Sequence, residues 1–412
     1  MNIRAVGDAI LDDFFTVTGS DIPPDVVLEF TTAAGVRQLP ADFARPHLAY
    51  VESLSSLPAG DATLRLTSQS ANAASNVVPV TVRAGPPPQA ARLLHAGEDK
   101  PHPYTIAIVA NPLIASHPQG VAAFRPDPIL TAAPRFRRAV TRCLKGLFAG
   151  AEDALVAEDV LRRDNIDARM RLVTVFRTPL PGGPSTPLRE ANSLIEQAPD
   201  NARAGLRLEQ LAGFLAKFPT GAGETKADVV IVLNNSETLN GSFSIPTQDD
   251  AERGGESYSF DDKERKHCHF ASAPGCSSLH IRNVDLDSPT VIHEFCHAAS
   301  ELNNGWIMDT SINMQPGTRF AVNQKHRADA KDAVPPDFAT YNGTTFRSNP
   351  VRFDGTPYPT HWTAYHPEPL DGRQRSLMDD WQGKPDRLRC RLDRLTYTWL
   401  RDRLNVKLSR QG

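Results

Sequence analysis

The first 84 residues alternate short apolar runs with turn-forming residues. Each run is rich in Val, Leu, Phe and Thr, and clusters of Gly, Pro, Ser and Asp separate it from the next run. Short strands at this spacing, without a helical pattern between them, predict a small Ig-like β-sandwich. The runs span residues 12–18, 26–30, 47–51, 62–66 and 77–82.

After about residue 100 the pattern changes to longer apolar runs that alternate with helical periodicity. Continuous apolar runs are typical of strands that are buried on both faces. Such runs occur at residues 105–110, 169–176 and 228–233, with a shorter one at 278–281. Apolar positions recur at helical spacing in residues 134–148, 187–218 and 385–407. The alternation predicts an α/β domain with a mostly parallel sheet covered by helices.

A proline run separates the two patterns. Gly85 is followed by three consecutive prolines, and such runs favour a stiff, extended chain. The sequence therefore predicts a multidomain protein of class β + α/β. Its parts are a β-sandwich over 1–84, a Pro-rich linker over 85–100, and an α/β domain over 101–412 that ends in a C-terminal helix.

Residues 288–305 predict a buried helix that contains candidate metal-binding and catalytic residues. Ser288 and Pro289 are typical of a helix start, Gly305 is a stop, and the positions between them are largely apolar. His293 and His297 lie four residues apart, which places them about 40° apart around the helix axis and about 6 Å along it. Two imidazoles so placed can bind one tetrahedral Zn²⁺, and Glu294 can act as a general base toward a water molecule at the metal.

The alternative is a solvated helix with two unrelated histidines. The flanking residues argue against it, because Val291, Ile292, Phe295 and Ala298 are all apolar. Burying two histidines and a glutamate without partners would cost several kcal/mol, roughly, and a metal ion supplies the partner. Cys296 is better interpreted as a small core residue than as a ligand.

The arrangement resembles the zincin metallopeptidases, in which a sheet leads into a His-Glu-x-x-His helix. Within that group, the stretch HEFCHAASELNNGWIMD at 293–309 is most similar to bacterial IgA-protease-type, metzincin-like peptidases. The resemblance covers roughly residues 100–382. It implies a bound zinc ion and hydrolysis of peptide bonds in a protein or peptide substrate, as in a zinc metalloendopeptidase.

The first fifth of the chain resembles the IPT/TIG branch of immunoglobulin-like domains. The segments FTVTGSDI, LPAGDATLRLTS and SNVVPVTVRAG carry this resemblance. It implies a spacer or binding module, and hence a contact with a protein or an assembly through the N-terminal domain.

The third zinc ligand departs from the metzincin pattern. A metzincin places His or Asp six residues after the second histidine, and this chain has Asn303 there. We favour Asp309, because it follows the helix stop at Gly305 and the chain can return under the metal. Glu301, His361 and His366 remain alternatives.

Two further features follow from the same resemblance. The segment 376–380, centred on Met378, is similar to the Met-turn beneath the metal of metzincins. Tyr365 and His366 precede it closely and are the best candidates to donate a hydrogen bond to the reaction's oxyanion. Tyr341 and Tyr358 remain weaker candidates for that donor.

The composition of the chain limits the classes of molecule that it is expected to bind. The 412 residues carry 45 Lys and Arg against 48 Asp and Glu, a net charge of −3, which does not favour nucleic acid or an anionic membrane. No apolar stretch approaches the roughly 18 residues of a membrane helix, and no Sec-type signal is recognisable. We expect a cytoplasmic protein or one exported by a non-Sec route.

The cysteines and remaining histidines leave two points open. Five scattered cysteines favour reduced thiols, although Cys268 and Cys276 could close a short disulfide loop. His267, His269 and His280 lie near the same cysteines, where a loop is favoured over a second metal site.

Two other functions compete with the peptidase. One is a zinc hydrolase that acts on an amide other than a peptide bond, which shares the same water chemistry. The other is a catalytically inactive, zincin-like binding or structural protein. The intact Glu294 argues against the second, because a scaffold has no use for a general base.

Overall fold

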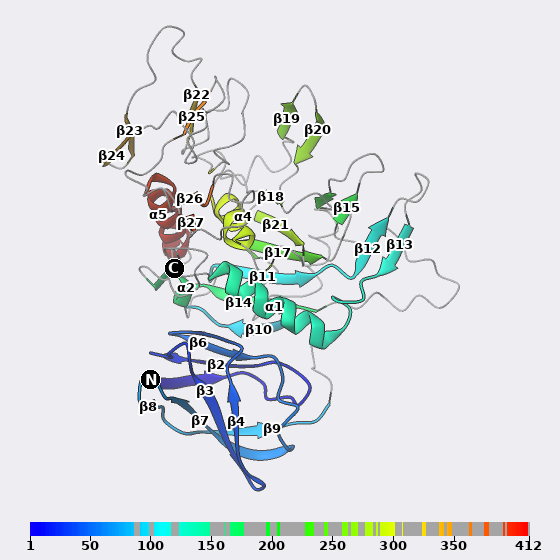
Figure 1. The fold of residues 1–412 in the computed structure, drawn as a ribbon, viewed down its shortest axis with the longest axis vertical. Helices are drawn as coiled ribbons and strands as arrows, with labels where there is room; N and C mark the ends of the chain where they lie inside the picture. The colour runs from blue at the N-terminus through cyan, green and yellow to red at the C-terminus, as the bar shows by residue number, and fades with distance from the viewer. Residues whose placement is uncertain are drawn as a thin grey trace.

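The computed structural model describes two connected parts of the chain (Figure 1). Its described residues are 1–85, 91–98, 103–116, 123–148, 161, 165–176, 195–197, 204–206, 227–234, 243–245, 258–262, 265–270, 277–282, 286, 289–300, 307, 324–326, 338–341, 344–347, 362–364, 375–378, 390–391 and 394–410.

The N-terminal part is a sandwich of two antiparallel sheets. One sheet has the order β1-β2-β6-β5, and the other has the order β4-β3-β7-β8 with β9 also paired to β7. Side chains alternate along β7 between buried and exposed, as expected where one face packs on a core. The strands are β1 (Asn2–Val6), β2 (Phe15–Ser20), β3 (Val27–Thr32), β4 (Gly35–Pro40), β5 (Phe43–Arg45), β6 (Leu48–Val51), β7 (Gly60–Ser68), β8 (Ala73–Ala74) and β9 (Val78–Val82).

The second part is organised around a six-stranded mixed sheet. Its order is β10-β14-β11-β17-β21-β18. The four central strands run parallel to one another, while β10 and β18 pair antiparallel at the two edges. The bounds are β10 (Ala91–His95), β11 (Thr105–Ala110), β14 (Arg171–Val175), β17 (Val229–Asn234), β18 (Phe243–Ile245) and β21 (Ser277–Arg282). Of the predicted multidomain β + α/β class, the described residues bear out a β-rich protein with antiparallel sheets, a mixed sheet and few helices.

The linker expected over 85–100 is wrong in part. Residues 91–95 form β10, which pairs with β14 through Ala91 and Val175 at one end. Leu94 and His95 are buried there, whereas Leu93 is exposed. The proline run directly before this short strand led to the expectation of a linker, and the burial pattern of the strand does not alternate. The prolines themselves, at 86–88, lie outside the described residues.

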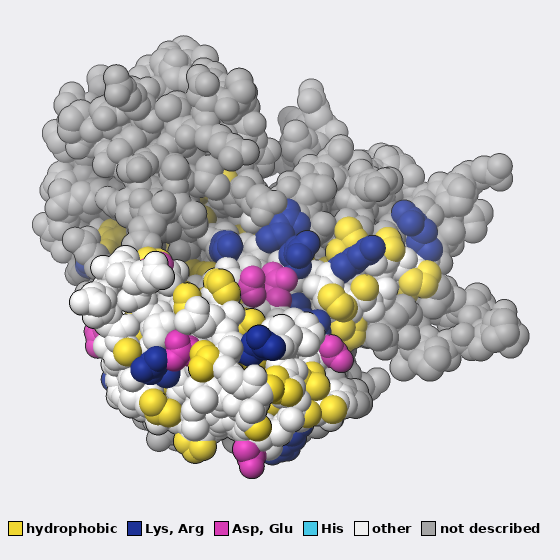
Figure 2. Space-filling view, turned by 60° about the horizontal axis from the view of Figure 1, so that its bottom comes forward, with side chains coloured by type: hydrophobic (Ala, Val, Ile, Leu, Met, Phe, Trp, Pro, Cys, Tyr) yellow, Lys and Arg dark blue, Asp and Glu magenta, His cyan; other side chains and the backbone are white. Residues whose placement is uncertain are grey.

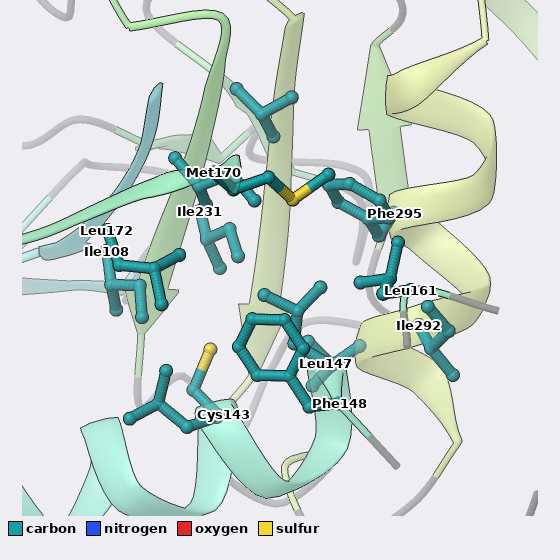
Figure 3. Close-up of a cluster of buried hydrophobic side chains, with 14 of the residues drawn as sticks. Ile108, Cys143, Leu147, Phe148, Leu161, Met170, Leu172, Ile231, Ile292 and Phe295 are labelled. Atoms are coloured by element: carbon teal, nitrogen blue, oxygen red, sulfur yellow. The ribbon is translucent and has the colours of Figure 1, made fainter. Parts of the chain in front are cut away.

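Helices cover the sheet and form one core with it. The helices are α1 (Ala133–Leu147), α2 (Ile166–Arg169), α4 (Thr290–Ala299) and α5 (Arg394–Arg410). Figure 3 shows side chains of α1 and α4 converging on side chains from the sheet. The cluster includes Ile108, Leu172 and Ile231 from strands, Cys143 and Leu147 from α1, and Ile292 and Phe295 from α4.

Short strand pairs occupy the remaining described segments. One of them departs from the one or two helices expected within 187–218, because β15 and β16 form an antiparallel pair there, while residues 207–218 lie outside the described residues. Pro199 and Gly205 interrupt this stretch, and both disfavour a helix interior. The pairs are β12 (Leu113–Ser116) with β13 (Ala123–Pro126), β15 (Ile195–Gln197) with β16 (Ala204–Leu206), β19 (Tyr258–Asp262) with β20 (Arg265–Phe270), β22 (Gln324–His326) with β25 (Trp362–Ala364), β23 (Phe338–Tyr341) with β24 (Thr344–Arg347), and β26 (Arg375–Ser376) with β27 (Cys390–Arg391).

The sandwich packs directly on the second part. Figure 1 shows it against β10 and α1. Its residues Phe14, Phe43, Leu48 and Tyr50 belong to the same buried cluster as the sheet and its helices. The Phe43 ring lies 5.9 Å from that of Phe148, centroid to centroid. The two parts therefore share apolar core across their boundary.

Within the described residues, no helix is both long and apolar enough to cross a membrane.

Candidate metal centre

The histidine helix α4 is short and wholly buried. It begins at Thr290, with Pro289 at the N-cap position, and all ten of its residues are buried. Phe295 and Cys296 lie in the hydrophobic core, as expected for packing residues. His293, Glu294 and His297 are thus held inside the protein, at 6–7% exposure.

The helix ends earlier than the sequence predicts. Expected to reach Gly305, it stops at Ala299, and Ser300 already has extended backbone angles. The Ser300 hydroxyl donates to the His297 carbonyl at 2.6 Å and accepts from the Ile307 N–H at 3.3 Å. Glu301 follows this helix end in the chain and lies outside the described residues.

The two imidazoles face each other through one atom each. His293 Nε2 and His297 Nε2 lie 3.3 Å apart. The ring planes are perpendicular, at 90°, with centroids 4.8 Å apart. A spacing of four residues brings the rings together, as the sequence predicts, and burial among apolar neighbours holds them there.

Each Nδ1 is engaged by a backbone carbonyl. His293 Nδ1 donates to Leu377 O at 2.7 Å, and His297 Nδ1 donates to Ile307 O at 2.6 Å. A carbonyl oxygen only accepts, so the proton of each neutral ring sits on Nδ1. Both Nε2 atoms then present lone pairs to each other across 3.3 Å. Between two neutral rings that contact is repulsive, and either a proton on one Nε2 or a bound metal cation would relieve it.

A tetrahedral zinc ion fits this geometry. Two zinc–nitrogen bonds of about 2.0–2.1 Å at the tetrahedral angle hold their nitrogens about 3.3–3.4 Å apart. The observed separation of Nε2 atoms agrees with that value. Metal-binding histidines also commonly donate their other N–H to a backbone carbonyl, which fixes the ring and its tautomer. His293 and His297 meet both conditions.

Sequence reasoning missed the carbonyl groups of Ile307 and Leu377. Main-chain acceptors leave no residue signature, so no spacing rule could identify them. An indirect signal existed, because Met378 had singled out this segment as similar to a Met-turn. Leu377 and Met378 are buried in the same cluster as α4, directly after β26.

The other predicted site residues lie outside the described residues: Asp309, Glu301, His361, Tyr365 and His366. His361 precedes β25 in the chain, and Tyr365 directly follows it. Tyr341 ends β23, and Tyr358 is not described. Among the residues that are described, no group of three or more His, Cys, Asp and Glu side chains could hold a metal. The third ligand therefore stays a prediction.

The expectations for the cysteines are likewise only partly covered by the described residues. Cys143 and Cys296 are buried free thiols, and burial raises the pKa of Cys143 to about 12. His267, Cys268 and His269 lie in β20, where only the backbone is described, and Cys276 is outside the described residues. The disulfide and the second metal site that were left open remain open.

Comparisons with known proteins supply no family. No family model matches the chain, and no curated protein matches it. One solved structure that matches is a "Putative bacterial DNA binding protein" from Bacteroides vulgatus, with 17% sequence identity and a TM-score of 0.18. The match covers 21% of this chain and 48% of the other, so the chain spans about half of that protein's length. Such a likeness does not establish a shared fold, and function must be inferred from the His293–His297 pair itself.

Proposed function

We propose that this protein is a zinc-dependent metallopeptidase of zincin type. The observation that carries the proposal is the separation of 3.3 Å between His293 Nε2 and His297 Nε2, with both Nδ1 atoms held by carbonyl groups. His293 and His297 would bind the ion through Nε2. A zinc ion there would act as a Lewis acid and make water nucleophilic near neutral pH.

The third position belongs to Asp309 in this proposal, with Glu301 and His361 as alternatives. Asp309 lies two residues along the chain from Ile307. The Ile307 carbonyl accepts from His297 at 2.6 Å, which brings that stretch of the chain to the histidines. This proximity supports Asp309 as the third ligand.

Glu294 is the proposed general base. It is buried on the same turn as His293, where few waters compete for its carboxylate. It would take a proton from the attacking water and deliver it to the leaving amine nitrogen, a role worth about 10²–10⁴-fold in rate. Tyr365 or His366 would donate a hydrogen bond to the oxyanion that develops on the scissile carbonyl.

The N-terminal sandwich, similar in sequence to IPT/TIG domains, would contact a protein partner or an assembly. The substrate would be a protein or a peptide.

The test combines metal analysis with peptide cleavage. Purified wild type should contain about one zinc per chain and cleave members of a peptide library. Glu294→Gln should keep the zinc and lose at least about 100-fold in cleavage rate. Glu29→Gln removes a carboxylate from β3 in the sandwich and serves as the matched control, with unchanged cleavage.

Three outcomes contradict the proposal in different ways. If the purified protein binds no zinc, the proposal loses its basis. Zinc without any peptide cleavage indicates the inactive zincin-like scaffold, and cleavage of non-peptide amides alone indicates the rival amide hydrolase. Cleavage that persists in Glu294→Gln refutes the role given to that residue.

A further inference from the structure

A cavity lies where the sandwich meets helix α1. Its volume is about 460 Å³, within the size range of small-molecule sites. Glu52 and Ser53, just after β6, line it from the sandwich. The opposite wall is α1, which contributes four arginines: Arg135, Arg137, Arg138 and Arg142.

The cavity carries a marked excess of positive charge. Four guanidinium groups and one carboxylate are among the residues that line it, and Asp13, which is not part of the lining, pairs with Arg137. The carboxylate of Glu52 is already engaged, because it accepts from the Thr141 hydroxyl at 2.6 Å. Its distance to Arg138 Nε is 3.8 Å, and the Arg138 side chain is 77% exposed. Figure 2 shows Lys and Arg side chains gathered beside acidic ones along this boundary.

Arg137 is the buried member of the set. Its NH1 lies 3.7 Å from Asp13 Oδ1, and Asp13 also pairs with Arg92. The Arg137 Nε–H has no hydrogen-bond partner among the described residues. A buried guanidinium with one long, shared ion pair is incompletely compensated, and an anion in the cavity would complete its electrostatic balance.

The spacing of the other three arginines indicates the shape of that anion. Arg135, Arg138 and Arg142 follow each other at three and four residues, so they share one face of α1. The row is about 10 Å long, at about 1.5 Å per residue. A single oxyanion would occupy only part of it. Guanidinium forks bind phosphoryl oxygens in pairs, and each phosphoryl group offers three acceptor oxygens.

We propose that this cavity binds a small molecule carrying two or more phosphoryl groups. Such a ligand matches the excess charge, the length of the arginine row and the volume together. It would also contact both the sandwich and α1, and so bridge the two parts of the protein.

The test is calorimetric titration of the full-length protein with fructose 1,6-bisphosphate as the probe. Inorganic phosphate is the single-group comparison, and tricarballylate is the comparison for carboxylates. The key variant is Arg138→Gln/Arg142→Gln. Its matched control is Arg37→Gln/Arg83→Gln, which removes the same charge from exposed arginines outside the cavity.

The bisphosphate should bind more tightly than phosphate or tricarballylate. The cavity variant should weaken its binding at least about tenfold, because charge-assisted hydrogen bonds are lost, while the control pair changes it less than about twofold. Arg138→Lys/Arg142→Lys keeps the charge but removes the forks, and should also weaken binding. Should the double variant fold poorly, Arg138→Gln alone carries the test, since that side chain is exposed.

Three results would overturn the inference. One is the absence of binding by the bisphosphate. Another is equal weakening by the cavity and control pairs, which would indicate general attraction to positive charge. The third is equal or tighter binding of tricarballylate, which would assign the cavity to carboxylates.

Discussion

His293 and His297 are oriented by carbonyl groups from two separate segments of the chain. The acceptor for His293 is Leu377, 84 residues away in sequence, and the acceptor for His297 is Ile307. The Ile307 segment is in turn held by Ser300, whose hydroxyl joins the helix end to the Ile307 N–H. The direction of the second Nε2 therefore depends on a side chain that does not touch the imidazole.

Under the proposal of a zinc site, Ser300→Ala should lower zinc affinity by about tenfold, because residues that orient metal ligands contribute about 10–100-fold. The substitution removes the acceptor of the Ile307 N–H, and the carbonyl that fixes His297 loses its support. Competition with a chromogenic chelator measures the affinity. Ser409→Ala is the control, since that exposed hydroxyl donates to Asn405 O in α5. Equal affinities of wild type and Ser300→Ala would contradict this role.

At the scale of elements, α4 is positioned by its contact with α1. Gly146 allows this close approach, since a Cβ there would lie 2.8 Å from Val291 Cγ2 and 3.0 Å from Val291 Cβ. Val291 precedes His293 by two residues on the same helix. The packing of α1 against α4 therefore influences where α4 places His293 and His297.

Gly146→Ala should destabilise the protein by about 1–2 kcal/mol. Alanine gains up to about 1 kcal/mol over glycine in a helix, but overpacking typically costs about 1–3 kcal/mol. The free energy of unfolding in urea measures the balance. The Gly146→Ala/Val291→Ala pair should be more stable than the sum of its single effects predicts, because the clash is gone. Additive effects would show that the contact is not restrictive.

How far the sequence predicts these elements depends on burial. Residues 105–110 are predicted to the residue as β11, because a strand covered on both faces is apolar throughout. By contrast, β4 is an exposed edge strand without an apolar pattern, and β10 follows a proline run, so both were missed. In the site, the spacing of His293 and His297 identified the pair. The carbonyl partners of the two histidines could not be predicted. They are main-chain atoms of residues distant in sequence, and no local sequence pattern encodes such contacts.

At the scale of the whole molecule, buried polar groups join the sandwich to the second part. Arg45 of β5 forms an ion pair with Asp167 of α2, its Nε donating to Oδ2 at 3.0 Å. The same guanidinium donates through NH1 to Phe148 O at 3.2 Å. Next to this pair, the His47 and His95 rings meet edge to face with centroids 4.7 Å apart. One histidine comes from each part, so the interface should respond to pH.

The pKa of His47 is lowered to about 2, first by burial and then by the neighbouring His95 and Arg45. Burial also lowers the pKa of His95, although the Met170 carbonyl and Asp167 oppose that shift. In the unfolded chain both rings titrate near pH 6.5. Their contribution to stability is therefore complete above about pH 6.5 and is lost as the pH falls toward the folded-state values.

Each histidine should lower the free energy of unfolding by up to about 1.4 kcal/mol per pH unit in that window. Urea unfolding at pH 7.5, 6 and 5 measures the slope. Between pH 6 and pH 5, the free energy of unfolding of His47→Gln should fall less than that of wild type, by up to about 1 kcal/mol. The difference arises because the variant lacks one histidine with a lowered pKa, and it does not depend on the variant's absolute stability. Carboxylates titrate alike in both proteins and cancel in the difference. Parallel pH dependences of wild type and variant would show that His47 takes up its proton equally in the folded and unfolded states.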